Sequence, residues 1–325
     1  MNRLAAAFAA LLAVSLAGGT ALAQSAWPTK PVKIVVPYPG GGGIDVLGRV
    51  LADKLGPKWG QPVIVESRPG ANTIIGAEAV KNSDDGHTLL LTTDATFTIN
   101  PHLYGDKLVY DPIKDFQPII LTVYFSQMMV ALPSFPASTV AELVALAKAQ
   151  PGKLTYASYG SGSQSHLATE GLKAAAGIDI LHVPYKGLQP AMTAVLAGEV
   201  NITWVGVASG QANVKAGRLK AIAIGGEKRA PQLPDMPTFR EAGYPTVDSN
   251  AWFGFFAPKG MPRTAIDRIH KDVAEIMADP AMQEKEVAAK GYNWSGAGPD
   301  DFAAFIRKEL ADRAAVVRIS GAKPE

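Results

Sequence analysis

Two loops rich in glycine and serine carry the residues best suited to binding a small anion. Loop 1 (Tyr38–Asp45) contains four consecutive glycines, at positions 40–43, between an expected strand and an expected helix. Glycine lets a ligand approach the backbone, and a helix N-terminus offers unpaired N–H groups with partial positive charge. The segment lacks the spacing of a dinucleotide fingerprint and the Gly-Lys-Ser/Thr ending of a P-loop. We expect an anion site, with a flexible turn as the alternative, at Tyr38, Gly41, Gly42, Gly43 and Ile44.

Asp45 stands where the helix after loop 1 is expected to begin. A carboxylate at that position normally caps backbone N–H groups, and capping is the role we expect. Direct contact with an anionic ligand would be repulsive, so any contact should pass through water.

Loop 2 (Ser158–His166) again lies between an expected strand and an expected helix. It offers backbone N–H groups, serine hydroxyls and an amide, and loops of this kind from two lobes can face each other across a cleft. Neither loop carries Lys or Arg, so a carboxylate would be held by neutral dipoles. The expected ligand contacts are Ser158, Gly160, Ser161, Ser163, Gln164 and His166, together with Thr93, Tyr185 and Trp204.

Other chemistries find less support in these residues. Loop 2 lacks the G-x-S-x-G nucleophile elbow, although a serine hydrolase stays open as an alternative. The five histidines show no metal-ligand spacing, and we expect neither a metal nor a cofactor. Tyr185, Trp204 and Trp252 could wall a pocket or pack in a core, and Lys186 could attract an anion or lie in solvent.

The elements that position the loops alternate between strand and helix. Residues 32–36 read as a strand, 46–55 as a helix ended by Gly60, and 63–65 as the next strand, which makes a parallel βαβ unit. A second unit has strands at 154–157, 181–183 and 219–224, and helices at 166–176 and between Pro190 and Gly198. A capping box at 139–142 opens a further helix, and the tail is helical. We expect an α/β fold in which the tail returns to the first lobe, with hinge crossings near Phe125 and Asp248.

Composition and the first residues indicate an exported protein. The chain has 325 residues, a formal net charge of +2 and no cysteine. The charge gives no reason to expect nucleic acid, and the absence of cysteine excludes a lipoprotein anchor and disulfides. Arg3, an apolar run and Ala21-Leu22-Ala23 are typical of a signal peptide cleaved after Ala23. We expect a periplasmic protein with a signal peptide at 1–23.

Short motifs along the whole mature chain resemble the Bug-type periplasmic receptors of tripartite tricarboxylate transporters. The segments that carry the resemblance are Lys30-Pro31, loop 1, Gly60–Val63, Glu66–Gly70, Asp85–Leu90, Asn100-Pro101, Tyr110–Pro112, Gly160–Leu167, His182–Gly187, Leu233–Thr238 and Trp252–Gly254.

The resemblance implies a two-lobed clamp like a type II periplasmic binding protein, closing by hinge motion on a small carboxylate. With the crossings expected near Phe125 and Asp248, we expect lobe 1 at 24–125 plus 248–325 and lobe 2 at 126–247. The resemblance also implies ligand contacts at Gly41–Asp45 and Gly160–Gln164, and partnership with a large and a small membrane subunit. We expect a monomer that performs no chemistry on its ligand; a carboxylate sensor feeding a signalling system is the alternative.

Two departures from the family pattern bear on the ligand. Ile44 replaces the usual Ser or Thr before the loop aspartate, and Asn201 and Val205 stand where aspartates are frequent. These changes suggest a less polar pocket without a counter-charge for an ammonium group. We therefore expect an apolar or aromatic mono- or dicarboxylate rather than an amino acid.

Overall fold

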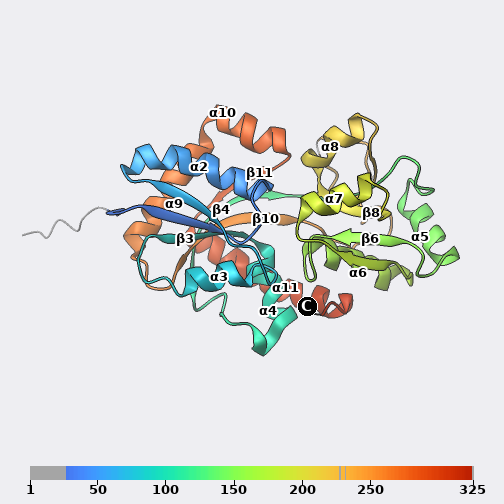
Figure 1. The fold of residues 1–325 in the computed structure, drawn as a ribbon, viewed down its shortest axis with the longest axis horizontal. Coiled ribbons are helices and arrows are strands. Elements are labelled where there is room, and N and C mark those ends of the chain that lie inside the picture. The colour runs from blue at the N-terminus through green and yellow to red at the C-terminus, as the bar shows by residue number, and fades with distance from the viewer. Residues whose placement is uncertain (1–26, 227, 231, 324–325) are drawn as a thin grey trace, which may run out of the picture.

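The computed structural model describes residues 27–226, 228–230 and 232–323. The expected signal peptide lies outside these residues. Two lobes lie side by side along the long axis of the molecule (Figure 1), each built around its own sheet. The expected α/β, two-lobed fold is confirmed. Among the described helices, none combines the length and apolar character needed to cross a membrane.

Lobe 1 contains a six-stranded sheet in the order β11-β4-β10-β3-β1-β2. Strand β1 pairs in parallel with β2 and β3, whereas β10 runs antiparallel to β3 and β4. The strands are β1 (Val32–Val36), β2 (Val63–Ser67), β3 (Thr88–Thr93), β4 (Phe116–Phe125), β10 (Ala251–Pro258) and β11 (Asn293–Ala297). The helices and turns are α2 (Gly43–Trp59), α3 (Ile74–Lys81), η1 (Ala95–Ile99), α4 (Asn100–Tyr104), η2 (Gly105–Lys107), α9 (Arg263–Ala278), α10 (Pro280–Met282), η3 (Gln283–Val287), η4 (Ala288–Lys290) and α11 (Pro299–Ser320).

Lobe 2 contains a five-stranded sheet in the order β7-β6-β8-β5-β9. Strand β6 pairs in parallel with β7 and β8, and β5 runs antiparallel to β8 and β9. The strands are β5 (Gln127–Ala131), β6 (Thr155–Ser158), β7 (Leu181–Pro184), β8 (Ile202–Gly206) and β9 (Lys220–Gly225). The helices are α5 (Val140–Ala149), α6 (Gln164–Ala176), α7 (Leu188–Leu196) and α8 (Val207–Lys215).

Local cap chemistry explains why several helices begin and end where the sequence predicts. Thr139 Oγ1 accepts the N–H of Glu142 at 3.2 Å, while the Glu142 carboxylate accepts the N–H of Ser138, which closes the capping box of α5. Gly60 and Gly177 end α2 and α6 in the left-handed conformation, with φ of 66° and 62°. An L side chain rarely adopts that conformation, so glycine fits these two ends.

The chain crosses between the sheets at Ser126 and again at 248–250. The two crossing segments are joined, because Ser126 Oγ and Asn250 Oδ1 lie 2.8 Å apart. Ser249 Oγ also donates to the carbonyl of Gly225 at 2.9 Å, which fixes the second segment to the end of β9. The crossings lie near the expected positions, while the boundaries of independent domains stay a prediction.

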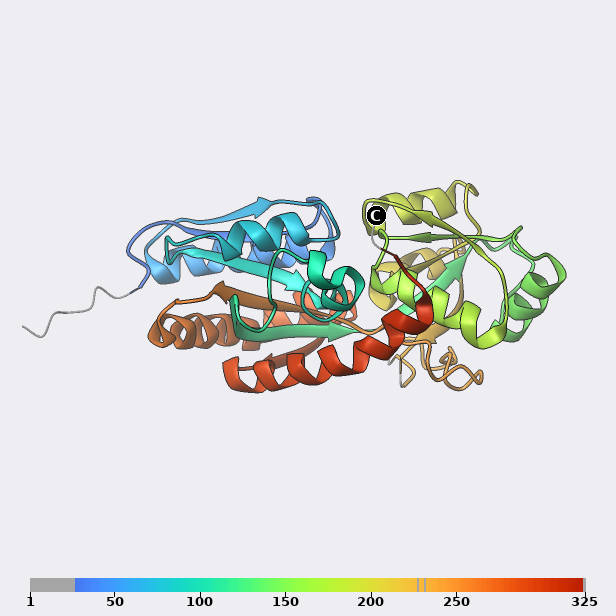
Figure 2. The same ribbon diagram turned by 90° about the horizontal axis from the view of Figure 1, so that it is seen from below.

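Helix α11 contacts both lobes rather than returning to lobe 1 alone. Its first half packs Phe302 and Ile306 into the core of lobe 1, and its second half lies against α6 of lobe 2 (Figure 2). Near its end, Val317 joins Leu167 of α6 and three residues of lobe 1 in a small buried cluster formed by Ala95, Ile99, Leu103, Leu167 and Val317. The tail therefore connects the lobes as a third element beside the two crossings.

Candidate ligand-binding site

Loop 1 leaves a row of backbone donors unpaired at the start of α2. The helix begins at Gly43, and Gly42 is its N-cap with no side-chain cap. The Gly41 N–H donates to Asp45 Oδ2 at 2.9 Å. Within the described residues, the N–H groups of Gly42, Gly43 and Ile44 have no partner. Because the helix dipole adds partial positive charge there, the arrangement can bind an anionic oxygen.

Asp45 is not the N-cap that the sequence suggested. It is the third residue of α2, and its carboxylate reaches back to Gly41 and forward to the Arg49 guanidinium, with both Arg49 contacts at 3.0 Å. Burial alone would raise its pKa, but Arg49 and the Gly41 N–H outweigh burial and hold the pKa below the ordinary value. Asp45 therefore shapes loop 1 as an ionised group neutralised by Arg49.

Tyr38 joins loop 1 to the end of β3. Its hydroxyl lies 2.6 Å from Thr93 Oγ1, which also accepts the N–H of Ala95 at 3.2 Å. Burial raises the pKa of Tyr38 well above its usual value, so the phenol is neutral. The structure thus brings together Tyr38 and Thr93, which are far apart in the sequence.

Sequence reasoning missed Tyr292, which lies directly behind loop 1. A Cβ atom at Gly43 would collide with the Tyr292 hydroxyl, so Gly43 is required for space. The Tyr292 ring packs against Phe125 and Phe253, with ring centroids 5.1 and 5.5 Å away. Its hydroxyl makes no hydrogen bond to another described residue. The run of glycines could signal close approach, but nothing nearby in the chain identifies the approaching group.

Most polar side chains of loop 2 form hydrogen bonds within the loop or with residues packed directly against it. Ser158 is fully buried, and its Oγ lies 2.6 Å from His182 Nε2, donates to the Gly160 carbonyl and accepts the Gly160 N–H. Tyr159 N–H donates to the buried Ser165 hydroxyl, and Ser163 Oγ caps α6 by accepting from His166 N–H. A serine–histidine pair within hydrogen-bond reach is present, but burial keeps the Ser158 hydroxyl from a substrate.

His166 fixes the conformation of loop 2 through a hydrogen bond and a ring contact. Its Nδ1 accepts the N–H of Gly162 at 2.9 Å, and its ring stacks on His182 with centroids 4.0 Å apart. Burial, then the neighbouring His182 and Lys173, lowers the pKa of His166 to about 3. The imidazole is therefore neutral at physiological pH, and it acts as an acceptor that fixes the loop rather than as a cation.

Two predicted contacts, Gln164 and Trp204, lie away from the exposed faces of the loops. Gln164 is 5% exposed, and its Nε2 donates to the Asp248 carbonyl at 3.0 Å. Trp204 is fully buried against Phe239 and donates from Nε1 to Thr169 Oγ1 at 2.9 Å. For Trp204, and for the equally buried Trp252, the core alternative is correct, because these large side chains fill the interior of their lobes.

Each loop lies at the junction of the lobes, close to residues of the opposite lobe. A Cβ at Gly187, just after Tyr185 and the exposed Lys186, would touch the Pro39 ring of loop 1 at 4.0 Å. A Cβ at Gly162 would lie 3.0 Å from Asn72 Nδ2 of lobe 1. Half-buried Tyr185 donates its N–H to the Ser158 carbonyl. Nowhere in the described residues do three or more His, Asp or Glu side chains gather as a metal site.

Comparison with known proteins identifies the family and supports the fold. Residues 47–321 match the model of the tripartite tricarboxylate transporter family receptor. Protein BugT of Bordetella pertussis is 34% identical over 302 residues, which cover 91% of each chain. An R. palustris protein solved with adipate is 31% identical, with a TM-score of 0.85 over 92% of this chain and 100% of that one.

A second solved relative has a different acid in its site. MatC of Rhodopseudomonas palustris, solved with bound malate, is 28% identical to this chain. Its TM-score is 0.83 over 90% of this chain and 100% of that chain. The resemblance read from the sequence motifs is confirmed, and the chain belongs to the family of tripartite tricarboxylate transporter receptors.

Proposed function

We propose that this receptor binds a small carboxylate between loop 1 and loop 2 in the periplasm, without altering it, and presents it as a monomer to two membrane subunits of a transporter. The observation that carries the proposal is the row of unpaired N–H groups at Gly42, Gly43 and Ile44, opposite the second loop. The adipate and malate bound by solved relatives support a carboxylate.

The sequence departures do not define the polarity of the ligand. Ile44 packs in the core of lobe 1, and Val205 packs in the core of lobe 2. Asn201 Oδ1 accepts the N–H of Thr155 at 2.8 Å and so extends the sheet. An apolar or aromatic carboxylate is supported instead by the rings of Phe125, Phe253 and Tyr292 beside Gly43.

A substitution at Gly42 separates binding from folding. Gly42 has an extended backbone that suits an aspartate N-cap, and the nearest atom to an added Cβ is the Pro39 carbonyl oxygen at 3.8 Å. In Gly42→Asp the new carboxylate should accept the unpaired N–H groups and stabilise α2 by a few tenths of a kcal/mol, at about the level by which aspartate exceeds glycine as an N-cap. The same change should weaken carboxylate binding at least about tenfold, because it fills the anion site with like charge.

The measurement is a thermal-shift and calorimetric titration against adipate, malate and benzoate, with Gly42→Ala as the matched control. The alanine variant adds a Cβ but no acceptor, so it should bind like the wild type. Equal affinity in the aspartate variant would refute the site. Recovery of the ligand unchanged distinguishes a receptor from the hydrolase alternative, and partner capture with the membrane subunits distinguishes transport from sensing.

A further inference from the structure

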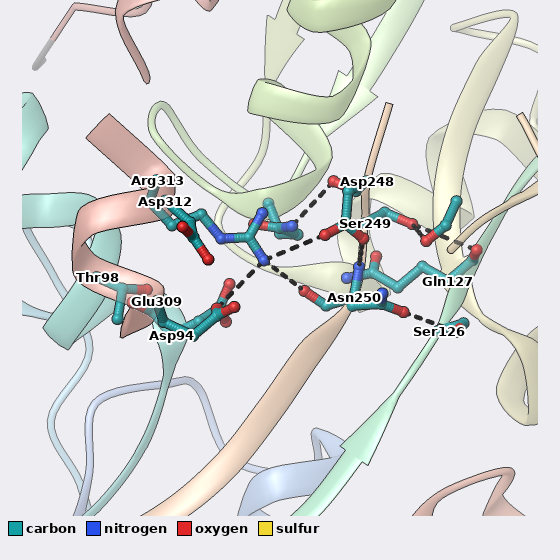
Figure 3. Close-up of polar contacts among 12 residues, drawn as sticks. Asp94, Thr98, Ser126, Gln127, Asp248, Ser249, Asn250, Glu309, Asp312 and Arg313 are labelled. Atoms are coloured by element: carbon teal, nitrogen blue, oxygen red, sulfur yellow. Dashed lines mark hydrogen bonds and ion pairs between the residues drawn. The ribbon is translucent and has the colours of Figure 1, made fainter. Parts of the chain in front are cut away.

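A buried arginine occupies the junction between the two lobes. Arg313 of α11 is 4% exposed, and its Nη2 lies 3.6 Å from Asp248 Oδ2, 3.5 Å from Glu309 Oε2 and 3.4 Å from the Asn250 carbonyl. Figure 3 shows the guanidinium between Glu309 of its own helix and the second crossing segment. Arg313 therefore connects α11 to the segment that carries the chain between the sheets.

A third carboxyl group, that of Asp94, lies near the same guanidinium and interacts with its charge, without an ion pair as close as those of Asp248 and Glu309. Asp94 is 2% exposed, and its Oδ2 has no hydrogen-bond partner among the described residues. Arg313 Nε and Gln164 Oε1 are also buried without a partner. The guanidinium thus pairs with Asp248 and Glu309 and acts on Asp94 through its charge alone, and several polar atoms around it lack a hydrogen-bond partner among the described residues.

This cluster has a covalent or hydrogen-bonded connection to each loop. Asp94 directly follows Thr93, whose hydroxyl holds Tyr38 of loop 1. The Asp248 carbonyl accepts a hydrogen bond from Gln164 of loop 2, which is also the first residue of α6. A hollow of about 230 Å³ beside Asp248, between α6 and α11, leaves the crossing segment room to move. A movement of Arg313 from one partner to another would therefore change the positions of residues in both loops.

We propose that Arg313 is a positioning residue that fixes the hinge by holding Asp248 and Asn250, and that ionised Asp94 draws it away and loosens the lobes. The proposal rests on the binding function only for its effect on ligand affinity. With Asp94 protonated, Arg313 remains on the crossing segment; with Asp94 ionised, the guanidinium is shared with lobe 1.

The charge on Asp94 changes in a useful pH range. Burial, with Glu309 and Asp248 adding to it against Arg313, raises the pKa of Asp94 to about 7. The other ionisable group near Asp94 on a neighbouring element is Tyr38, and burial keeps it neutral. Asp312, next to Arg313, instead pairs with Lys308 at 2.6 Å. The contact of Arg313 with Asp248 and Asn250 should therefore restrict hinge motion below pH 7 and restrict it less above pH 7.

The test measures lobe separation without a ligand. The chain has no cysteine, so Lys54→Cys on α2 and Lys148→Cys on α5, both exposed, allow two spin labels. Pulsed electron–electron double resonance between the two labels should give a narrow distribution of label-to-label distances at about pH 6 and a broader one at about pH 8. In Asp94→Asn the distribution should stay narrow at both pH values, whereas Asp312→Asn should behave like the wild type.

Variants of the arginine complete the design. Arg313→Gln should give the broad distribution at both pH values, and Arg313→Lys should partly restore the narrow one. When a bound carboxylate is available, its Kd should rise about fivefold from pH 6 to pH 8 in the wild type and stay constant in Asp94→Asn. Identical distributions at both pH values in the wild type, or no change in Arg313→Gln, would overturn the proposal. Failure of every carboxylate to bind would instead count against the proposed function alone.

Discussion

Asp94 is a buried carboxyl group whose ionisation is costly to the folded protein. It is buried, one carboxyl oxygen lacks a partner, and its one cationic neighbour is shared with Asp248 and Glu309. Asp45 is equally buried but has Arg49 and the Gly41 N–H, so its pKa falls rather than rises. Depth and partners both contribute to this contrast, because Asp45 lies beside the exposed Arg49 side chain whereas Asp94 lies deep between the lobes.

Asp94→Asn should therefore stabilise the protein at high pH. Because the folded pKa of about 7 lies above the ordinary 3.8, the folded state binds more protons between these values, and wild-type stability should fall as pH rises through that window. Above it, the isosteric amide should be more stable than the wild type by roughly 1–4 kcal/mol, and near pH 4 the two should be equal. Urea unfolding at both pH values measures this, and a pH-independent difference would contradict it.

At the scale of one element, the side chains of loop 2 form the hydrogen bonds to backbone N–H groups that regular secondary structure would otherwise provide. Ser158, Ser163, Ser165 and His166 each bond to a backbone N–H of the loop or of the first turn of α6. The loop is thereby rigid before a ligand arrives, which lowers the entropy cost of binding. Its hydroxyls serve mainly to shape the site, and the unpaired donors are backbone N–H groups at the starts of α2 and α6.

Ser158→Ala should test this support. The change removes the hydroxyl that accepts the half-buried Gly160 N–H and contacts His182, and losing a hydrogen bond of this kind costs about 0.5–1.5 kcal/mol. We expect that loss in denaturant unfolding together with weaker carboxylate binding. Ser209→Ala is the matched control, since the exposed Ser209 hydroxyl donates only to the Gly206 carbonyl. Wild-type affinity and stability in Ser158→Ala would show that the loop does not need this bond.

Features built from neighbouring residues could be predicted from the sequence, and those built from distant ones could not. The strand at 32–36, the capping box of α5 and the glycine ends of α2 and α6 follow from local periodicity and cap chemistry. The contact of Tyr292 with Gly43 and the approach of Arg313 to Asp94 depend on how the lobes fold together. Asp45 was misassigned because α2 starts two residues before it.

At the scale of the whole molecule, three connections make the two lobes one unit. The crossings at Ser126 and Asn250 bond to each other, and α11 spans the junction. The buried cluster of Ala95, Ile99, Leu103, Leu167 and Val317 adds apolar contact between α11, α6 and lobe 1. Polar connections can exchange partners during hinge motion, whereas an apolar cluster opposes full separation because opening exposes it to water.

Leu167→Ala should therefore uncouple the lobes more than an equal loss of core elsewhere. Leu167 is fully buried in the inter-lobe cluster, and its truncation should cost about 2–5 kcal/mol. Leu172→Ala, on the same helix, removes an equally buried side chain from the core of lobe 2 alone. Calorimetry should show one transition for the wild type and for Leu172→Ala, shifted down in the latter, but two for Leu167→Ala. One transition in both variants would mean that the crossings and Arg313 suffice to couple the lobes.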